Sequence, residues 1–258
     1  MQTIMRPVAV FDLDGTFYRE QFLFLLMVVF LRRGIFPKRL RKPFRDLIRL
    51  KDNRDIGYHD YDHRLIALFL EGIEGADVKQ VEAASRYVAK EYKKYVYTFT
   101  RELVEYLRAT HDLITITGAN EQVVQHVVDN WKFKDFYGTK LEIKDGKFTG
   151  RESELSVTRK GEVLLKHIAD HDGLTLEGSV AIGDSRSDAE MLKLVSHPIA
   201  FSPDDLLAPI AEENGWPIVV ERRNLYVNHG NDPARRFPLS DAKAAVAYVL
   251  GLPQRRSP

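Results

Sequence analysis

The chain has 258 residues, of which 44% are hydrophobic, and its 38 lysines and arginines nearly balance 37 aspartates and glutamates. This length is sufficient for a substantial core plus an inserted module, and the near-zero net charge gives no global case for nucleic-acid binding. The chain has no cysteine, which excludes a disulfide framework, and we expect no signal peptide before the early first strand and a cytoplasmic location.

The first predicted element is an apolar strand, Val8 to Phe11, which runs into Asp12 and Asp14. Open α/β sheets bind ligands where such a strand ends and opens into a loop. Because side chains alternate along a strand, the two carboxylates start on the same side. One can attack a phosphorus atom while the other handles a proton, with a cation offsetting their charge. An Asp-x-Asp-Gly segment also occurs in turns and calcium loops, so these residues alone leave both interpretations open.

Residues 18–97 lack strand alternation and carry helix-like segments at roughly 20–33, 37–51, 59–72 and 77–95. We therefore expect an all-helical cap over 18–97, inserted into a core formed by residues 1–17 and 98–258, with a C-terminal tail from about residue 225. The apolar run Phe22 to Leu31 is too short to span a bilayer. It predicts a helix buried between cap and core, with a lipid-contacting surface as the alternative.

The next part of the cap is strongly basic. Only Asp46 and Asp52 oppose the positive side chains of this segment, which are Arg32, Arg33, Lys38, Arg39, Arg41, Lys42, Arg45, Arg49, Lys51 and Arg54. The pattern favours a solvated amphipathic helix. The alternative is a surface that attracts anionic substrates, an acidic membrane or nucleic acid.

A third apolar stretch, residues 113–116, predicts a strand that ends in Thr117 and Gly118 before a helix from Asn120 to Trp131. The Thr117 hydroxyl and nearby backbone N–H groups suit an oxyanion, while Asn120 is the better candidate for the helix cap. Lys160 opens the amphipathic stretch 160–168. A cation at a helix start is disfavoured by the helix dipole unless an anion compensates it.

A second acidic cluster follows the apolar run Ser179 to Ile182 and contains Asp184 and Asp188. If this strand lies parallel to and beside the first one, its carboxylates meet those of the first motif at one sheet edge. Oxygen-rich ligands of this kind suit Mg²⁺. For Asp188 the alternative is a place in the first turn of a helix over 188–195.

Four further segments complete the prediction. They are a helix over 204–214, a last strand over 216–220 followed by a basic irregular tail, a helix over 240–250 that docks on the core, and a frayed end over 253–258.

The order of the motifs Asp12-x-Asp14-Gly-Thr, Thr117-Gly118, Lys160 and Gly183-Asp184-x-x-x-Asp188 resembles the four motifs of the haloacid dehalogenase-like hydrolase superfamily. The resemblance covers nearly the whole chain and is closest to its phosphoserine-phosphatase-like subclass, IB, over residues 141–220. It implies an α/β fold, with a Rossmann-like parallel sheet core, helices on both faces and a small helical cap that closes over the site.

The resemblance also implies a Mg²⁺-dependent phosphatase acting on a small phosphorylated metabolite. Asp12 would be the nucleophile that forms an aspartyl-phosphate, and Asp14 the general acid and base. Asp188 would orient Lys160 or a metal-bound water. The Mg²⁺ ligands would be the Asp12 carboxylate, the Asp14 main-chain carbonyl and Asp184, and the phosphate ligands would be Thr117, the Gly118 N–H and Lys160.

Substrate contacts are less well matched. Glu20 lies one position before the expected hinge glutamate, Gln21 occupies that spacing, and Arg64 lies in a context similar to the family's substrate arginine. These three are the candidate substrate residues, and the identity of the substrate does not carry over. Two alternatives are a phosphotransferase that uses the same aspartyl-phosphate, and a lipid-phosphate phosphatase or a membrane- or nucleic-acid-associated protein that uses the basic, apolar cap. The sequence does not indicate an oligomeric state.

Overall fold

A computed structural model describes residues 5–154, 159–229 and 234–252, and the predicted frayed end lies outside these residues. Its centre is a nine-stranded sheet with the strand order β4-β3-β2-β1-β5-β6-β7-β8-β9. The strands are β1 (Arg6–Phe11), β2 (Asp112–Asn120), β3 (Asp135–Lys144), β4 (Lys147–Glu154), β5 (Leu174–Gly183), β6 (His197–Phe201), β7 (Ile218–Glu221), β8 (Asn224–Asn228) and β9 (Arg235–Pro238).

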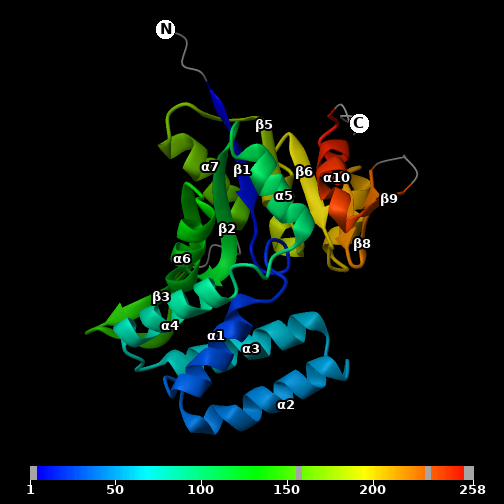
Figure 1. Cartoon of the computed structure of the whole chain (residues 1–258). Helices are drawn as coiled ribbons and strands as arrows, with labels where there is room; N and C mark the ends of the chain where they lie inside the picture. Colours follow the sequence, from blue (N-terminus) through cyan, green and yellow to red (C-terminus); the bar gives the residue numbers. More distant parts are fainter. Residues whose placement is uncertain (1–4, 155–158, 230–233, 253–258) are drawn as a thin grey trace.

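The sheet is parallel from β3 to β7 and antiparallel at both margins. Helices cover both of its faces (Figure 1). Along β1, Ala9 and Phe11 belong to one apolar cluster and Val8 and Val10 to another, as the alternation of a strand buried on both faces requires. On the first face lie α5 (Thr98–Leu107), α6 (Glu121–Trp131) and α10 (Ala242–Val249), and on the second α7 (Lys160–Asp170), α8 (Ala189–Leu192) and α9 (Leu207–Glu213). The predicted Rossmann-like core is confirmed.

The two strands that carry the acidic motifs are neighbours. β1 lies between β2 and β5 and is parallel to both, with Val10 opposite Ile114 on one side and Ala181 on the other. The chain builds one half of the sheet outward from β1 through β2 to β3, and the other half from β5 through β6 to β7. Crevices at such a switch point are where open α/β sheets bind ligands.

Between β1 and α5 the described secondary structure is helical. It consists of α1 (Phe22–Arg33), a short 3₁₀ turn η1 (Lys38–Leu40), α2 (Arg41–Asp52), α3 (Tyr58–Ile73) and α4 (Val78–Glu91). Figure 1 shows α1, α2 and α3 as a layer at one end of the sheet. The apolar run of α1 is largely buried, as predicted. Its buried residues are Phe22, Leu25, Leu26, Met27, Val29, Phe30 and Leu31.

The helices between β1 and α5, called the helical layer below, contact the sheet domain beyond their connections. Helix α4 packs along α6, α1 contacts β2, and the turn between α3 and α4 pairs with the β3–β4 hairpin. In that turn the Gly75 N–H donates to the Phe148 carbonyl at 2.8 Å, and the Phe148 N–H donates to the Ala76 carbonyl at 3.1 Å. The β3–β4 hairpin is therefore part of the interface between the sheet domain and the helical layer.

The two connections to the helical layer are tied together around Glu221. This buried carboxylate at the end of β7 accepts hydrogen bonds from the Thr98 and Phe99 N–H groups at 3.0 and 2.8 Å, and so caps α5. It also pairs with Arg19, whose Nε donates to the Val96 carbonyl at 3.1 Å. A single side chain thus fixes both crossing segments to the sheet.

We expect Glu221→Ala to lower the free energy of unfolding by about 3 kcal/mol, because it leaves buried N–H donors and a partly buried guanidinium without their acceptor. Denaturant unfolding measures this change. Glu221→Gln keeps an acceptor oxygen and should lose less. An alanine variant as stable as the parent would contradict the capping role of Glu221.

The predicted helices are confirmed with shifts of a few residues at their ends, but the prediction of an irregular tail after residue 220 is wrong. Strands β8 and β9 extend the sheet there, with Leu225, Val227 and Phe237 buried. Their alternation was hidden because both strands are short and carry arginine or tyrosine on the open face. The predicted helix over 188–195 is a 3₁₀ turn, η3 (Arg186–Asp188), followed by the short α8.

The basic segment of residues 32–54 is mostly solvent-exposed, as an amphipathic helix over a buried apolar face predicts. Phe44 and Leu47 form the buried side of α2. No helix within the described ranges is long and apolar enough to cross a membrane.

Candidate active site

The carboxyl ends of β1 and β5 bring Asp12, Asp184 and Asp188 together, with one ligand oxygen of each within 4.8 Å of the others. Lys160, the first residue of α7, lies among them. Its Nζ donates to Asp12 Oδ1 at 2.8 Å and to Asp188 Oδ1 at 2.6 Å. The side chain of Lys160 is only 2% exposed, so these carboxylates are the anions that a buried cation at a helix start requires.

Asp188 is held firmly in this position. Its Oδ2 accepts hydrogen bonds from the N–H groups of Asp184 and Ser185 at 3.0 and 2.9 Å. Gly183 makes room for it, since a Cβ at that position would lie 2.3 Å from the Asp188 carboxyl carbon. Both oxygens of Asp188 are therefore engaged by the protein, which fits a residue that positions Lys160.

Asp14 is held by the first helix of the helical layer. The Phe22 N–H, at the start of α1, donates to Asp14 Oδ1 at 3.0 Å. Burial raises the pKa of Asp14 to about 8, despite the lowering effect of that hydrogen bond. Asp14 is thus a partly buried carboxyl that favours its protonated form at neutral pH, as a general acid needs.

Asp12 differs from Asp14 in its neighbours. Burial raises its pKa to about 6, while the Lys160 cation works in the opposite direction. The pKa of Lys160 is lowered by burial but raised more by Asp12 and Asp188, so the lysine stays charged. With these two pKa values, Asp12 is mostly ionised and Asp14 mostly protonated near neutral pH.

The acidic group also has the composition of a site for a hard cation. Burial raises the pKa of Asp184 well above its usual value, and the charges of Asp12 and Asp188 add to the rise. The single positive charge of Lys160 offsets only part of the negative charge of these carboxylates. A bound cation would offset the remainder. Thr16 Oγ1 donates to Asp184 Oδ1 at 3.2 Å, and a Cβ on Gly15, which has φ +80°, would lie 2.0 Å from Asp184 Oδ2. An all-oxygen donor set of this kind fits Mg²⁺.

The predicted phosphate loop lies at the same edge, at the end of β2. Thr117 is fully buried, and its Oγ1 accepts a hydrogen bond from the Ala119 N–H at 3.2 Å. Gly118 lines the same cavity as Asp12 and Lys160, and its carbonyl accepts a hydrogen bond from Thr139 Oγ1 at 2.8 Å. β2 continues past the predicted end, through Asn120.

A cavity of about 230 Å³ opens from these residues toward the helical layer. Its lining is rich in hydrogen-bond acceptors. Asn120 is only 6% exposed and holds the N-cap position of α6, yet its side chain makes no capping bond. Among the described residues, Asn120 Oδ1 and Gln21 Oε1 are buried oxygens without a hydrogen-bond partner. Asp62 and Glu152 add carboxylates to the same cavity, and burial raises the pKa of each.

The three candidate substrate residues do not lie together. Gln21 lines this cavity, and its Nε2 donates to Asp62 Oδ1 at 3.1 Å and to the Tyr58 hydroxyl at 2.7 Å. Glu20 lines an adjoining pocket near the hinge. Arg64 lines a separate groove between α2 and α3.

Sequence reasoning missed Asp62, Asn120 as a cavity residue, and Thr16. Thr16 could have been found, because it lies within the first motif. Asp62 could not, since an acidic residue on a helix is usually a solvated charge and only the packing of α3 against the site distinguishes it.

Comparison with known proteins agrees with this geometry. A family model described as haloacid dehalogenase-like hydrolase matches residues 9–193. A probable phosphatase of Mycobacterium tuberculosis is 24% identical over 218 residues, which cover 83% of this chain and 75% of that protein. The phosphoserine phosphatase SerB1 of the same species is 31% identical over 150 residues, covering 57% of this chain and 48% of its own length.

Solved structures share the fold. A structure of a protein of unknown function from Bordetella pertussis Tohama I has a TM-score of 0.62 at 23% identity and covers 83% of this chain and 98% of that one. A phospho-aspartyl intermediate analogue of phosphoserine phosphatase has a TM-score of 0.56 at 21% identity, over 84% of this chain and 94% of the other. The match of the family model over most of the chain, on a site with all four motifs at one sheet edge, shows that this protein belongs to the haloacid dehalogenase-like hydrolases.

Proposed function

We propose that the protein is a Mg²⁺-dependent phosphomonoesterase that acts through an aspartyl-phosphate on Asp12. The observation that carries the proposal is the buried Lys160, which is paired with Asp12 and Asp188. Asp14 lies beside them with a raised pKa. This arrangement supplies a nucleophile, a proton donor and a fixed positive charge at the ligand-binding edge of the sheet.

In the first half of the reaction a carboxylate oxygen of Asp12 attacks the phosphorus atom, and the bond from phosphorus to the leaving oxygen breaks. Asp14 gives its proton to that oxygen, so that a neutral alcohol leaves. The charge on the phosphoryl oxygens is stabilised by the Lys160 ammonium, the Thr117 hydroxyl and the Gly118 N–H.

In the second half a water attacks the phosphorus of the aspartyl-phosphate. Asp14, now ionised, takes the proton from the water, and the Asp12 carboxylate is released with inorganic phosphate. Closure of the helical layer over the site would exclude other water during the first half.

The ligands of Mg²⁺ would be the Asp12 carboxylate, the Asp14 carbonyl and Asp184. The bound cation would reduce the repulsion between Asp12 and the phosphate dianion.

Phosphate release tests the proposal. We expect the full-length protein to hydrolyse an aryl phosphate with Mg²⁺ and to lose this activity with EDTA, and we expect Asp184→Asn to need more Mg²⁺ for half-maximal rate. A metabolite panel that includes phosphoserine then ranks substrates. Hydrolysis unaffected by EDTA would contradict the metal dependence, and inactivity on the whole panel would contradict the hydrolase itself.

The pH dependence should be bell-shaped. Catalysis needs Asp12 ionised and Asp14 protonated, so kcat/KM should fall below a pH of about 6 and again above about 8. Raising the Mg²⁺ concentration favours ionised Asp12 and should move the acid limb to lower pH. A leaving group that needs no protonation should flatten the alkaline limb. Rates that keep rising above pH 9 for an alkyl phosphate would exclude Asp14 as the acid.

The cavity wall also points to a class of leaving group. Asp62, Glu152, Asn120 Oδ1 and Gln21 Oε1 offer acceptor oxygens, of which the two amide oxygens have no partner, and Lys160 is already paired with carboxylates. Arg64 lies in another groove, and the other positive groups that line this cavity, Arg186 and His59, are exposed. The less exposed part of the lining therefore favours an amine-bearing phosphomonoester, and a substrate carboxylate would have Arg186 as its candidate partner.

We expect the enzyme to prefer phosphoethanolamine-like amino alcohol phosphates to neutral alkyl phosphates of equal size. Asp62→Asn should lower kcat/KM for the amine about tenfold, with little change for the neutral compound. Asp60→Asn, an exposed neighbour on α3, is the matched control. Equal losses on both substrates would exclude a contact between Asp62 and the amine.

A further inference from the structure

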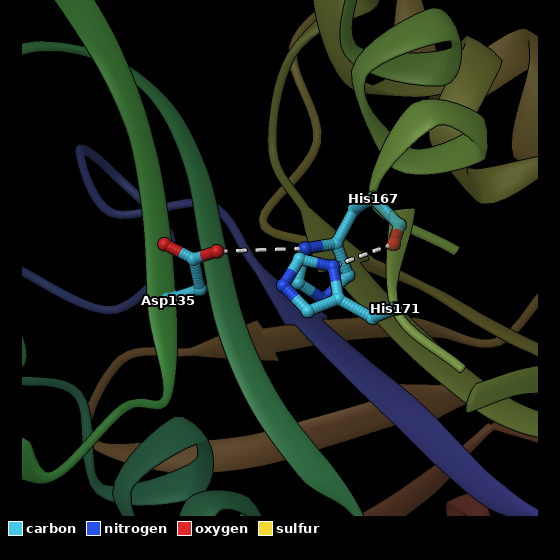
Figure 2. Close-up of side chains that lie close together, drawn as sticks. All are labelled: Asp135, His167 and His171. Atoms are coloured by element: carbon cyan, nitrogen blue, oxygen red, sulfur yellow. Dashed lines mark hydrogen bonds and ion pairs between the residues drawn. The ribbon is translucent and has the colours of Figure 1, made fainter. Parts of the chain in front are cut away.

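A second cluster of ligand-type side chains lies at the opposite end of the sheet from the active site. Asp135 begins β3, His167 lies in the last turn of α7, and His171 follows that helix. One ligand atom from each of the three lies within 4.8 Å of the others. Figure 2 shows Asp135, on β3, facing the two imidazole rings.

The hydrogen bond made by His171 leaves its other ring nitrogen available to a metal ion. Its Nδ1 lies 2.9 Å from the His167 carbonyl oxygen, which only accepts hydrogen bonds, so this nitrogen carries the proton. The lone pair of the neutral ring is then on Nε2. A histidine ligand whose other nitrogen donates to a backbone carbonyl is the usual arrangement at a metal centre, because the hydrogen bond fixes the tautomer and the ring.

His167 and Asp135 have a spacing that one ion can bridge. His167 Nδ1 lies 3.6 Å from Asp135 Oδ2, and the His167 side chain is 3% exposed. Two tetrahedral zinc ligands, each about 2.0–2.1 Å from the ion, lie about 3.3 Å apart. The rings of His167 and His171 are only 4.3 Å apart between centroids, which disfavours a positive charge on both.

We propose that Asp135, His167 and His171 form a binding site for a borderline transition metal such as Zn²⁺, separate from the acidic site at Asp12. Two imidazoles and one carboxylate suit Zn²⁺ and not Mg²⁺, and three protein ligands leave a fourth position for water. A bound ion would fasten the end of α7, the helix that starts at Lys160, to the start of β3.

The competing explanation is a simple hydrogen-bonded cluster centred on Tyr137. Its hydroxyl lies 2.8 Å from His167 Nδ1 and 3.4 Å from Asp135 Oδ2, so it competes with a metal ion for that nitrogen. Loss of the hydroxyl in Tyr137→Phe should leave Zn²⁺ affinity equal or higher if the metal site exists.

The experiment is a titration of the full chain with Zn²⁺ by calorimetry, and with Co²⁺ by visible absorption, on an Asp184→Asn background with excess Mg²⁺ to suppress binding at the acidic site. We expect one site, and we expect His171→Ala to weaken it more than about tenfold. His171 is exposed, so this variant should fold, which circular dichroism checks. Zn²⁺ should also raise the Tm of the parent and not of His171→Ala.

His63→Ala is the matched control, because His59 and His63 form another pair four residues apart, with their rings 5.2 Å apart. It should leave Zn²⁺ affinity unchanged. Absence of a Zn²⁺ site, an affinity unchanged by His171→Ala, or a clear loss of affinity in Tyr137→Phe would each overturn the proposal.

Discussion

Asp12→Asn should reduce kcat for every phosphomonoester about 10⁴-fold or more, because the amide cannot form the aspartyl-phosphate and no other carboxylate can replace it. Asp14 is held by the Phe22 N–H, and Asp188 is held by Lys160 and two N–H groups, so neither can move into the position of Asp12. Initial rates of phosphate release with saturating Mg²⁺ measure the loss.

The fold should survive this substitution. Asn has nearly the shape of Asp, Lys160 keeps its bond to Asp188, and the repulsion that helps raise the pKa of Asp184 is reduced. We therefore expect a Tm within a few degrees of that of the parent. Asp46→Asn, a carboxylate on the surface of α2, should leave both rate and Tm unchanged.

Trapping the intermediate distinguishes loss of the nucleophile from loss of the metal. Acid quenching during turnover should recover a hydroxylamine-sensitive phosphoryl group on the parent protein and none on Asp12→Asn. Residual activity within tenfold of the parent, or a trapped phosphoryl group on the variant, would show that another residue attacks the phosphorus.

A site residue could be predicted from the sequence where its immediate neighbours in the chain indicate its role. Asp12, Asp14 and Asp184 were predictable because each directly follows an apolar strand, and parallel strands place their carboxyl ends at one edge. Lys160 was predictable for a different reason, since a cation at a helix start requires an anion nearby. The structure supplies that anion twice, as Asp12 and Asp188.

The substrate side of the site was not predictable in the same way. Whether Asp62 or Arg64 on α3 faces the cavity depends on how that helix rotates against α1 and β4, which is decided by packing and not by local propensity. Asn120 shows the same limit. Its place before a helix predicts a cap, but its side chain faces the cavity without a capping bond. The strands β8 and β9 were missed because their pairing is with β7 and with each other, and short strands carry little pattern of their own.

Lys160→Met should be the most damaging substitution to stability in the site. Methionine fills most of the volume of the lysine stem but leaves Asp12 and Asp188 as buried carboxylates without their cation, and breaking a buried ion pair in this way costs about 3–5 kcal/mol. Denaturant unfolding at pH 8 measures the loss. Lys166→Met, on an exposed turn of the same helix, should change the free energy of unfolding little.

The destabilisation should depend on pH in a defined direction. Lys160 lowers the pKa of Asp12, so its removal raises that pKa above the value of about 6 that burial gives it now. An acid whose folded-state pKa lies above its unfolded-state pKa destabilises the fold progressively as pH rises from the unfolded-state value to the folded-state value, and the cost is complete above the latter, so a higher folded-state pKa adds cost only at the higher pH. The difference between Lys160→Met and the parent should therefore be smaller at pH 5 than at pH 8. An equal difference at both values would exclude unpaired carboxylates as its cause.

A double variant separates folding from catalysis. Adding Asp188→Asn to Lys160→Met removes one of the two unpaired charges and should restore part of the lost stability, which a double-mutant cycle at pH 8 quantifies. Activity should not recover, since the phosphoryl oxygens still lack the ammonium, and kcat should stay about 10²–10³-fold below that of the parent. Recovery of activity together with stability would mean that Lys160 acts only by holding the site in shape, and the phosphate contact assigned to it would have to be withdrawn.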